Sequence, residues 1–183
     1  MRVVSGSARG TVLETIEGLD TRPTTDRVKE AVFSMIQTHI YGSSCLDLFS
    51  GSGALGIELL SRGADFAVFV ESGAKPAKII QKNLERTQLV EKSKLILGDV
   101  YGKIKALKGE KYDIIIMDPP YLSGHVKKTL MLIEQCDLLS ESGIIVVEHE
   151  ISDDEAQKHG TSFECYKSKK YGKIGISVYR RSL

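Results

Sequence analysis

An apolar run, "YDIIIM" at residues 112–117, ends on "DPPY" at residues 118–121, a sequence suited to holding an amine. Pro119 favours an extended conformation for Asp118, and neither proline has a backbone N–H to donate. The turn therefore presents hydrogen-bond acceptors, the Asp118 carboxylate and the Pro119 carbonyl, beside the ring of Tyr121. Two acceptors can orient both N–H bonds of an exocyclic nucleobase amine while the ring stacks on the base. This arrangement predicts chemistry at that nitrogen.

A second motif, "GSGALG" at residues 51–56, has the G-x-G-x-x-G spacing between a predicted strand and a predicted helix. The small residues Gly51, Ser52 and Gly53 let a ligand approach the backbone closely, and the start of the helix offers N–H groups. Glu71 follows Gly51 by twenty residues, the spacing at which an acid bonds ribose hydroxyls. The motif predicts a site for a nucleotide-like cofactor.

Three acids, Asp47, Glu71 and Asp99, are predicted to converge at the carboxyl ends of neighbouring strands. This edge of an open α/β sheet forms the ligand crevice. Acids there disfavour an anionic pyrophosphate but favour the sulfonium, ammonium, ribose and adenine amine of S-adenosylmethionine. Each acid also has a local alternative, such as a helix N-cap for Asp99. The motifs favour S-adenosylmethionine over a nicotinamide dinucleotide.

The elements that must position these motifs alternate between strand and helix from residue 44 onward. Strands are predicted at "CLDLFSG", "FAVFVE", "KLILGD", "YDIIIMD" and "GIIVVEHE". Helices are predicted between them, including "ALGIELLSR", which Gly63 should terminate. Two final strands surround a Lys/Gly turn. The continuous apolar strands predict an α/β fold with a Rossmann-like, doubly wound, mostly parallel sheet and an antiparallel hairpin at its edge.

The first 43 residues have a different pattern. "VVSGSARGTVLET" predicts a short hairpin, and "RPTTDRVKEAVFSMIQTH" predicts a helix capped by Thr24 or Thr25. The segment "YGSS" at residues 41–44 then interrupts the pattern. We therefore predict an N-terminal hairpin and helix extension at 1–43 and a main domain at 44–183.

Composition narrows the class of protein. The chain has 183 residues, of which 27% are charged and 42% hydrophobic, which is typical of a globular protein. No apolar run approaches the ~18–20 residues that span a bilayer, and no secretory signal is visible. The three cysteines and four histidines have no metal-ligand spacing. These features predict a cytoplasmic protein without a membrane segment or a metal site.

Charge is unevenly distributed along the chain. The net charge is +1, yet residues 161–183 hold six Lys/Arg and one acid, while residues 44–160 are net acidic. A basic end on an acidic core indicates either a surface that faces a polyanion or a solvated hairpin face. The charge pattern leaves both interpretations open.

Taken together, the sequence resembles the RsmD-type 16S ribosomal RNA guanine-N2 methyltransferases, which are class I S-adenosylmethionine-dependent enzymes. The resemblance covers nearly the whole chain, through "RVVSGSARG", "RPTTDRVKEAVFSMI", "LDLFSGSGALGIELLSRGA", "FVE", "GD" and "MDPPY". It implies a seven-stranded sheet with an antiparallel last strand. It also implies methyl transfer from S-adenosylmethionine to a guanine of small-subunit ribosomal RNA, free or in an assembly particle.

The resemblance also implies roles for individual residues. The methionine part of the cofactor would be lined by Asp47, Gly51, Ser52 and Gly53. The ribose would be bound by Glu71, and the adenine by Asp99 and Val100.

The target base would be held by the catalytic residues Asp118, Pro119 and Tyr121. Facing the RNA, over the mouth of the site, would be Arg22, Thr24, Asp26 and Arg27. Thr11 follows Arg9-Gly10 where relatives often have a basic residue.

Other functions share parts of these motifs. Methylation of DNA adenine-N6 or of a protein glutamine would use the same "DPPY" turn. An NAD-dependent oxidoreductase would use the glycine loop but would leave Asp118 and Tyr121 without a role. A non-catalytic RNA-binding module is a further alternative.

Overall fold

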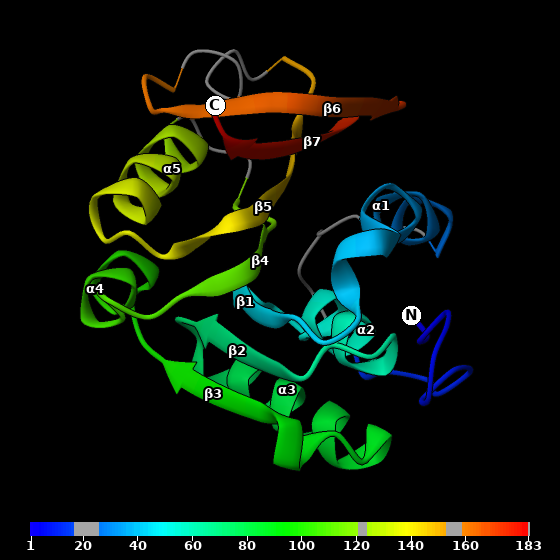
Figure 1. The fold of residues 1–183 in the computed structure, drawn as a ribbon. Coiled ribbons are helices and arrows are strands. Elements are labelled where there is room, and N and C mark those ends of the chain that lie inside the picture. The colour runs from blue at the N-terminus through cyan, green and yellow to red at the C-terminus, as the bar shows by residue number, and fades with distance from the viewer. Residues whose placement is uncertain (17–25, 121–123, 153–158, 183) are drawn as a thin grey trace.

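The structure is a computed structural model that describes residues 1–16, 26–120, 124–152 and 159–182. These residues form a sheet between two layers of helices (Figure 1). The strands are β1 (Ser44–Leu48), β2 (Phe66–Glu71), β3 (Ser93–Leu97), β4 (Tyr112–Met117), β5 (Leu139–Glu150), β6 (Phe163–Tyr171) and β7 (Ile174–Arg181). The helices are α1 (Asp26–Ile40), α2 (Ala54–Ser61), α3 (Ala74–Thr87), the 3₁₀-helix η1 (Val90–Lys92), α4 (Val100–Ala106) and α5 (His125–Gln135).

The sheet has seven strands in the order β3-β2-β1-β4-β5-β7-β6. Strand β7 is antiparallel to both β5 and β6, and the pairs among β1 to β5 are parallel. The predicted fold is therefore confirmed, including the antiparallel hairpin at the edge. The chain winds outward in both directions from β1 and β4, so their carboxyl ends form the switch point where open α/β sheets bind ligands.

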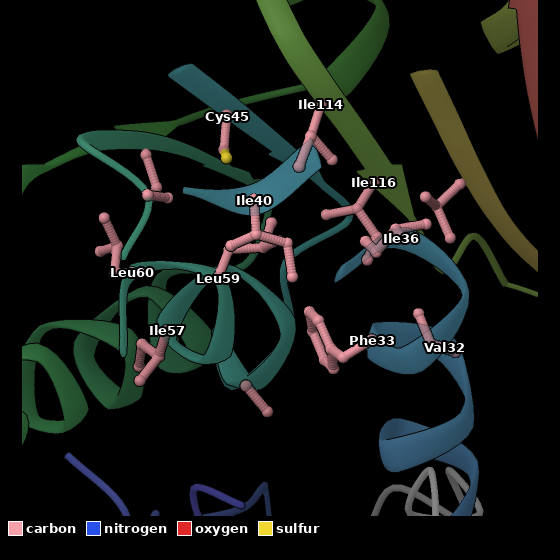
Figure 2. Packing of buried hydrophobic residues seen from close by; sticks show 14 of the residues in the cluster. Val32, Phe33, Ile36, Ile40, Cys45, Ile57, Leu59, Leu60, Ile114 and Ile116 are labelled. Carbon is pink, nitrogen blue, oxygen red and sulfur yellow. The ribbon is translucent and has the colours of Figure 1, made fainter. Parts of the chain in front are cut away.

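Each face of the sheet is covered by apolar packing. Helices α1, α2 and α3 share one apolar cluster with one face, and α4 and α5 share a second cluster with the other face. On the first face, Phe33 and Ile36 of α1 lie near Ile116 of β4 (Figure 2). Burial on both faces explains why the strands are continuous apolar runs.

Helix α2 ends where the sequence predicts. Gly63 has a φ of 103°, the left-handed region that glycine adopts without a steric penalty. Its N–H donates to the Leu60 carbonyl at 3.1 Å, and the Ala64 N–H donates to the Leu59 carbonyl at 3.1 Å. These two bonds form a Schellman motif, which turns the chain sharply from α2 into β2.

The N-terminal segment docks on the end of α2. The predicted short hairpin is present: Arg2 and Val12 form an antiparallel bridge, and the Val3 N–H donates to the Thr11 carbonyl at 2.9 Å. The backbone N–H of Ser7 donates to the Ser61 carbonyl at 2.8 Å, and the N–H of Ala8 donates to the Ser61 hydroxyl at 3.0 Å. The buried apolar side chains before residue 43, such as Val3, Leu13 and Phe33, belong to the same apolar cluster as those of α2. The division into two domains stays a prediction.

A buried ion pair fastens this segment further. The side chains of Lys29 and Glu58 are both fully buried, with Nζ and Oε2 3.2 Å apart. The Glu58 carboxylate also accepts from the N–H groups of Val4 at 2.8 Å and Ser5 at 3.0 Å, and from Arg62 Nε at 2.8 Å. One carboxylate of α2 therefore holds both α1 and the N-terminal segment.

We expect Gly6→Ala to destabilise the protein more than Gly10→Ala. Both glycines have a φ of +85°, which costs an alanine about 1–2 kcal/mol. A Cβ at Gly6 would lie 1.7 Å from the Ser61 carbonyl oxygen, whereas a Cβ at Gly10 has open space. The clash should cost about 1–3 kcal/mol more. Urea unfolding of the two variants measures the difference, and equal midpoints would contradict the docking of the segment on α2.

Candidate active site

Four carboxylates lie on one face of the sheet, near the carboxyl ends of its parallel strands. Alternation along the strands places Asp47, Glu71 and Glu148 on the sheet face covered by α1, α2 and α3, the face shared by Cys45, Phe69 and Val146. Asp118, directly after β4, continues the same face beyond Ile116. Two of the three acids predicted to converge, Asp47 and Glu71, therefore share this face with Asp118 and with Glu148, which the sequence does not single out; the convergence of Asp99 with them stays a prediction.

The Glu71 carboxylate is hydrogen-bonded to the glycine loop. Gly51 and Gly53 have φ values of 56° and 76°. Glu71 Oε2 accepts from the Gly51 N–H at 2.8 Å, and Oε1 accepts from the Gly73 N–H at 2.7 Å. A Cβ at Gly53 would approach Ile80 of α3 to 3.2 Å. The carboxylate predicted to bind ribose thus also sets the shape of the loop from the neighbouring strand.

Asp47 supports the start of α2 from beneath the loop. Its side chain is 1% exposed, and Oδ2 accepts from the Gly56 N–H at 2.9 Å. Burial raises the pKa of Asp47 to about 7, against the hydrogen bond from Gly56 and with a further rise from the charge of Glu71. A Cβ at Gly56 would lie 2.4 Å from the Phe69 ring. The local role that the sequence left open for Asp47 is therefore real, and its contact with a ligand stays a prediction.

Three N–H groups of the glycine loop have acceptors within the protein. Gly51 N–H donates to Glu71, Gly53 N–H to the Ser50 carbonyl at 2.7 Å, and Gly56 N–H to Asp47. A pyrophosphate needs such N–H groups free at the start of a helix. The two carboxylates beside the loop, Asp47 and Glu71, disfavour an anionic dinucleotide and favour a ligand that is cationic and rich in donors.

A residue in α3 joins the loop to the N-terminal segment. Asn83 is fully buried, and its Nδ2 donates to the Ser52 carbonyl at 2.9 Å and the Glu14 carbonyl at 3.0 Å. Its Oδ1 accepts from the Glu14 N–H at 2.8 Å. Ser52, predicted to line the cofactor, is thus positioned by a side chain that no local sequence pattern reveals.

Asp118 lies at the end of β4, beside the switch point, and is partly buried. Its pKa is raised well above the usual range, chiefly by burial, then by the charge of Glu148 and then by that of Asp47. Glu148 itself is 3% exposed on β5, the next strand. Pro119 is buried and Pro120 is exposed. The turn thus begins with a carboxylate that burial and two neighbouring acids make more basic than an ordinary aspartate.

Several predicted substrate residues fall outside what the structure describes. Tyr121, Arg22 and Thr24 lie outside the described residues. Arg27 is in α1, but its side chain and that of Asp26 also lie outside the description. Their roles stay predictions.

The adenine side of the predicted site contains a capped helix. Asp99 is exposed and caps α4, its Oδ2 accepting from the Gly102 N–H at 2.9 Å, while Val100 is buried in the second apolar cluster. The cap that the sequence offered as an alternative is therefore present. Its contact with adenine, and that of Val100, stay predictions.

An aromatic group that the sequence analysis misses stands nearby. Phe49 directly follows β1 with a φ of 60°, unusual for a residue with a side chain. Its ring packs edge-on against those of Tyr101 and His125, which stack at 6.0 Å. The Tyr101 hydroxyl and His125 Nδ1 are hydrogen-bonded. These rings tie the first residues of α4 and α5 to the end of β1.

The described residues hold neither a metal cluster nor a membrane-spanning helix. Within 1–16, 26–120, 124–152 and 159–182, no three His, Cys, Asp or Glu side chains cluster as metal ligands. No described helix is both long and apolar enough to cross a bilayer.

Comparison with known proteins decides the family. The family model described as "Conserved hypothetical protein 95" matches residues 1–180. The chain belongs to this family. Ribosomal RNA small subunit methyltransferase D of Escherichia coli (strain K12) is 31% identical over 181 residues, covering 99% of this chain and 90% of that protein. The predicted resemblance is confirmed.

Two further matches extend over the whole chain. The protein named "Putative rRNA methyltransferase YlbH" of Bacillus subtilis (strain 168) is 37% identical over 185 residues, covering 99% of both proteins. The solved structure titled "Putative methyltransferase yhhF from Escherichia coli" is 32% identical with a TM-score of 0.88, covering 100% of this chain and 98% of that one. The family and the fold therefore apply to the full length.

Proposed function

We propose that this chain transfers a methyl group from S-adenosylmethionine to the exocyclic N2 amine of a guanine in small-subunit ribosomal RNA. The observation that most supports this is the position of Asp118, a basic carboxylate at the sheet edge beside the glycine loop. Relatives that match the full chain are named for methylation of ribosomal RNA, and the Escherichia coli relative for that of the small subunit.

The residues present suit S-adenosylmethionine. Glu71 is a carboxylate placed at the glycine loop, where it can accept from ribose hydroxyls. Gly51 and Gly53 leave room for a ligand against the backbone, since neither has a side chain. The Asp47 and Glu71 carboxylates beside the loop disfavour an anionic dinucleotide, so an NAD-dependent oxidoreductase is the weaker candidate. When bound, the cofactor supplies an electrophilic methyl group.

The protein's own contribution is to orient an amine and accept a proton. The Asp118 carboxylate and the Pro119 carbonyl accept from the two N–H bonds of the amine, which aims the nitrogen lone pair at the methyl carbon. Transfer would break the bond between the methyl carbon and the cofactor sulfur, leave a neutral thioether and release one N–H proton, for which Asp118 is the acceptor. A carboxylate with a raised pKa is a stronger base than an ordinary aspartate once it is deprotonated.

Identification of the modified nucleoside tests the proposal. The protein is incubated with labelled S-adenosylmethionine and, separately, naked small-subunit ribosomal RNA or particles from cells that lack the protein. We expect label in N2-methylguanosine from one of the two substrates. Label in N6-methyladenosine or in protein glutamine would overturn the proposed substrate, and absence of transfer to either RNA substrate would overturn the proposed function.

The pH dependence of methyl transfer should report the charge of Glu148. Asp118 must be deprotonated to accept the proton, so the rate should fall in acid as Asp118 protonates. Glu148 raises the pKa of Asp118 because it is a like charge beside it. Glu148→Gln removes that charge and should move the acid limb of the kcat profile to lower pH.

Glu150 provides a matched control for this prediction. It lies two residues further along β5 and is exposed, so Glu150→Gln should leave the acid limb where it is. The measurement is kcat against pH with both substrates saturating. An acid limb that stays in place in Glu148→Gln, or moves to higher pH, would contradict the assignment of this limb to Asp118.

A further inference from the structure

We propose that the tip of the β6–β7 hairpin, with Lys169, Lys170 and Lys173, binds the phosphates of the RNA strand next to the target base. This inference rests on the proposed function and assigns a docking surface to it. Three features support it: the position of the tip, its charge and the division of the sheet edge between cofactor and substrate.

The strand register places the tip at the catalytic edge. Glu148 of β5 pairs with Ile176 of β7, and Ile176 pairs with Lys169 of β6. Lys169 therefore lies in the same transverse row as Glu148 and Asp118, about 14 Å from Asp118 across three strand spacings. Ile176 belongs to the apolar cluster on the α1 side, so Lys169 shares the sheet face of the acids.

The turn between the strands lies at the same edge. Strand β5 runs in the same direction as β4, and its last residue, Glu150, pairs with Ile174, the first residue of β7. Lys173, directly before β7, is exposed, and its carbonyl accepts from the Ile151 N–H at 3.1 Å. The turn is therefore fixed to the end of β5. An RNA strand that passes over Asp118 can reach it there.

The charge of the hairpin suits a polyanion. The side chains of Lys169, Lys170 and Lys173 are all exposed. In the described hairpin, residues 163–181, Glu164 is the single acid, and it pairs with Arg180 at 2.7 Å, at the other end of the strands. Arg180 lies opposite Glu164 at the far end of the hairpin. Lys169, Lys170 and Lys173 lie at or next to its turn, with Lys169 and Lys170 on opposite faces of the strand. A cluster of exposed lysines is the electrostatic footprint of phosphate binding.

The sheet edge divides into two halves at Asp118. The glycine loop, Glu71 and Asp99 follow β1, β2 and β3, so the predicted cofactor residues lie on one side. The strands on the other side are β5, β7 and β6 (Figure 1). An RNA strand that places its target base at Asp118, next to a bound cofactor, must therefore run over the β5, β7 and β6 half of the edge. The hairpin tip lies in that half.

A rival basic surface lies on the opposite sheet face. Lys105 and Lys127 line a cavity of about 360 Å³ between α4 and α5, together with Tyr101 and Met131. Those helices cover the face that Asp118 does not share. Lysines there provide a matched control, because their removal changes the net charge equally.

The test compares two triple variants for binding to a naked small-subunit ribosomal RNA transcript. One is Lys169→Ala, Lys170→Ala and Lys173→Ala. The other is Lys105→Ala and Lys127→Ala at the cavity, with Lys108→Ala, an exposed lysine two residues after α4. Loss of three phosphate contacts to a single strand should lower the slope of log K against log salt by about 2, and weaken binding about 100-fold at 0.1 M salt. The control triple should bind as the wild type does.

Further measurements separate binding from folding. Thermal unfolding and the affinity for S-adenosylmethionine should be unchanged in both triples, and a Lys→Arg triple at the hairpin should retain RNA binding. Wild-type affinity in the hairpin triple, or an equal loss in both triples, overturns the inference while leaving methyl transfer intact. If the wild-type protein methylates no small-subunit RNA, the proposed function fails and the inference fails with it.

Discussion

Asp118→Ala should reduce kcat for methyl transfer by about 10²–10⁴-fold, the usual contribution of a positioned acid–base group. The alanine removes both the acceptor that orients the amine and the base that takes its proton. Cofactor affinity should remain as in the wild type, because the glycine loop is held by Glu71 and Asp47 instead. Single-turnover transfer and calorimetry with S-adenosylmethionine measure the two quantities separately.

Asp113 offers a matched control on the same strand. It lies at the opposite end of β4, where its carboxylate accepts from the Ser44 N–H at 2.9 Å and the Ser140 hydroxyl at 2.8 Å. Asp113→Asn should lower stability while leaving kcat unchanged. Methyl transfer at the wild-type rate in Asp118→Ala would eliminate Asp118 as a catalytic group.

Glu58→Ala should destabilise the fold by about 3–5 kcal/mol, because it leaves the Lys29 ammonium buried without its carboxylate. It also removes the acceptor for the N–H groups of Val4 and Ser5. For a chain of this size the loss corresponds to a fall in Tm of roughly 10 °C. Urea unfolding at neutral pH measures the change in the free energy of unfolding.

Glu14 provides a control for this prediction, because it is a carboxylate that pairs with cations at the surface. It also pairs with two cations, Lys82 at 3.3 Å and Arg86 at 3.1 Å, but its side chain is 36% exposed. Glu14→Ala should therefore cost only about 0–1 kcal/mol. A double change, Lys29→Met with Glu58→Gln, should recover much of the stability lost in Glu58→Ala, since no unpaired charge is then buried. Similar costs for Glu14→Ala and Glu58→Ala would contradict the central role of the buried pair.

The edge of the sheet that forms the site is readable from local sequence. Asp47, Glu71 and Asp118 each stand at or near the end of an apolar run that a turn follows, and parallel strands bring such ends together. Glu148 escapes this pattern because β5 continues to Glu150 before any turn begins. Its role is visible only from the pairing of β4 with β5.

Supports that join distant segments have no local signal. Asn83 reads as one polar residue of an amphipathic helix, yet it bonds to Glu14, 69 residues earlier in the chain. Glu58 likewise bonds to Val4, 54 residues away. The N-terminal hairpin is predicted from its local pattern, but its docking on Ser61 of α2 is not. These contacts depend on long-range packing, which the hydrophobic periodicity of the sequence does not reveal.

A structure of the protein with S-adenosylhomocysteine and guanosine tests the central claim most directly. We predict that the Asp118 carboxylate and the Pro119 carbonyl both lie within about 3.2 Å of the guanine N2 amine, with the cofactor sulfur facing that nitrogen. A guanine bound with its N2 amine away from Asp118, or a cofactor bound away from the glycine loop, would contradict the account.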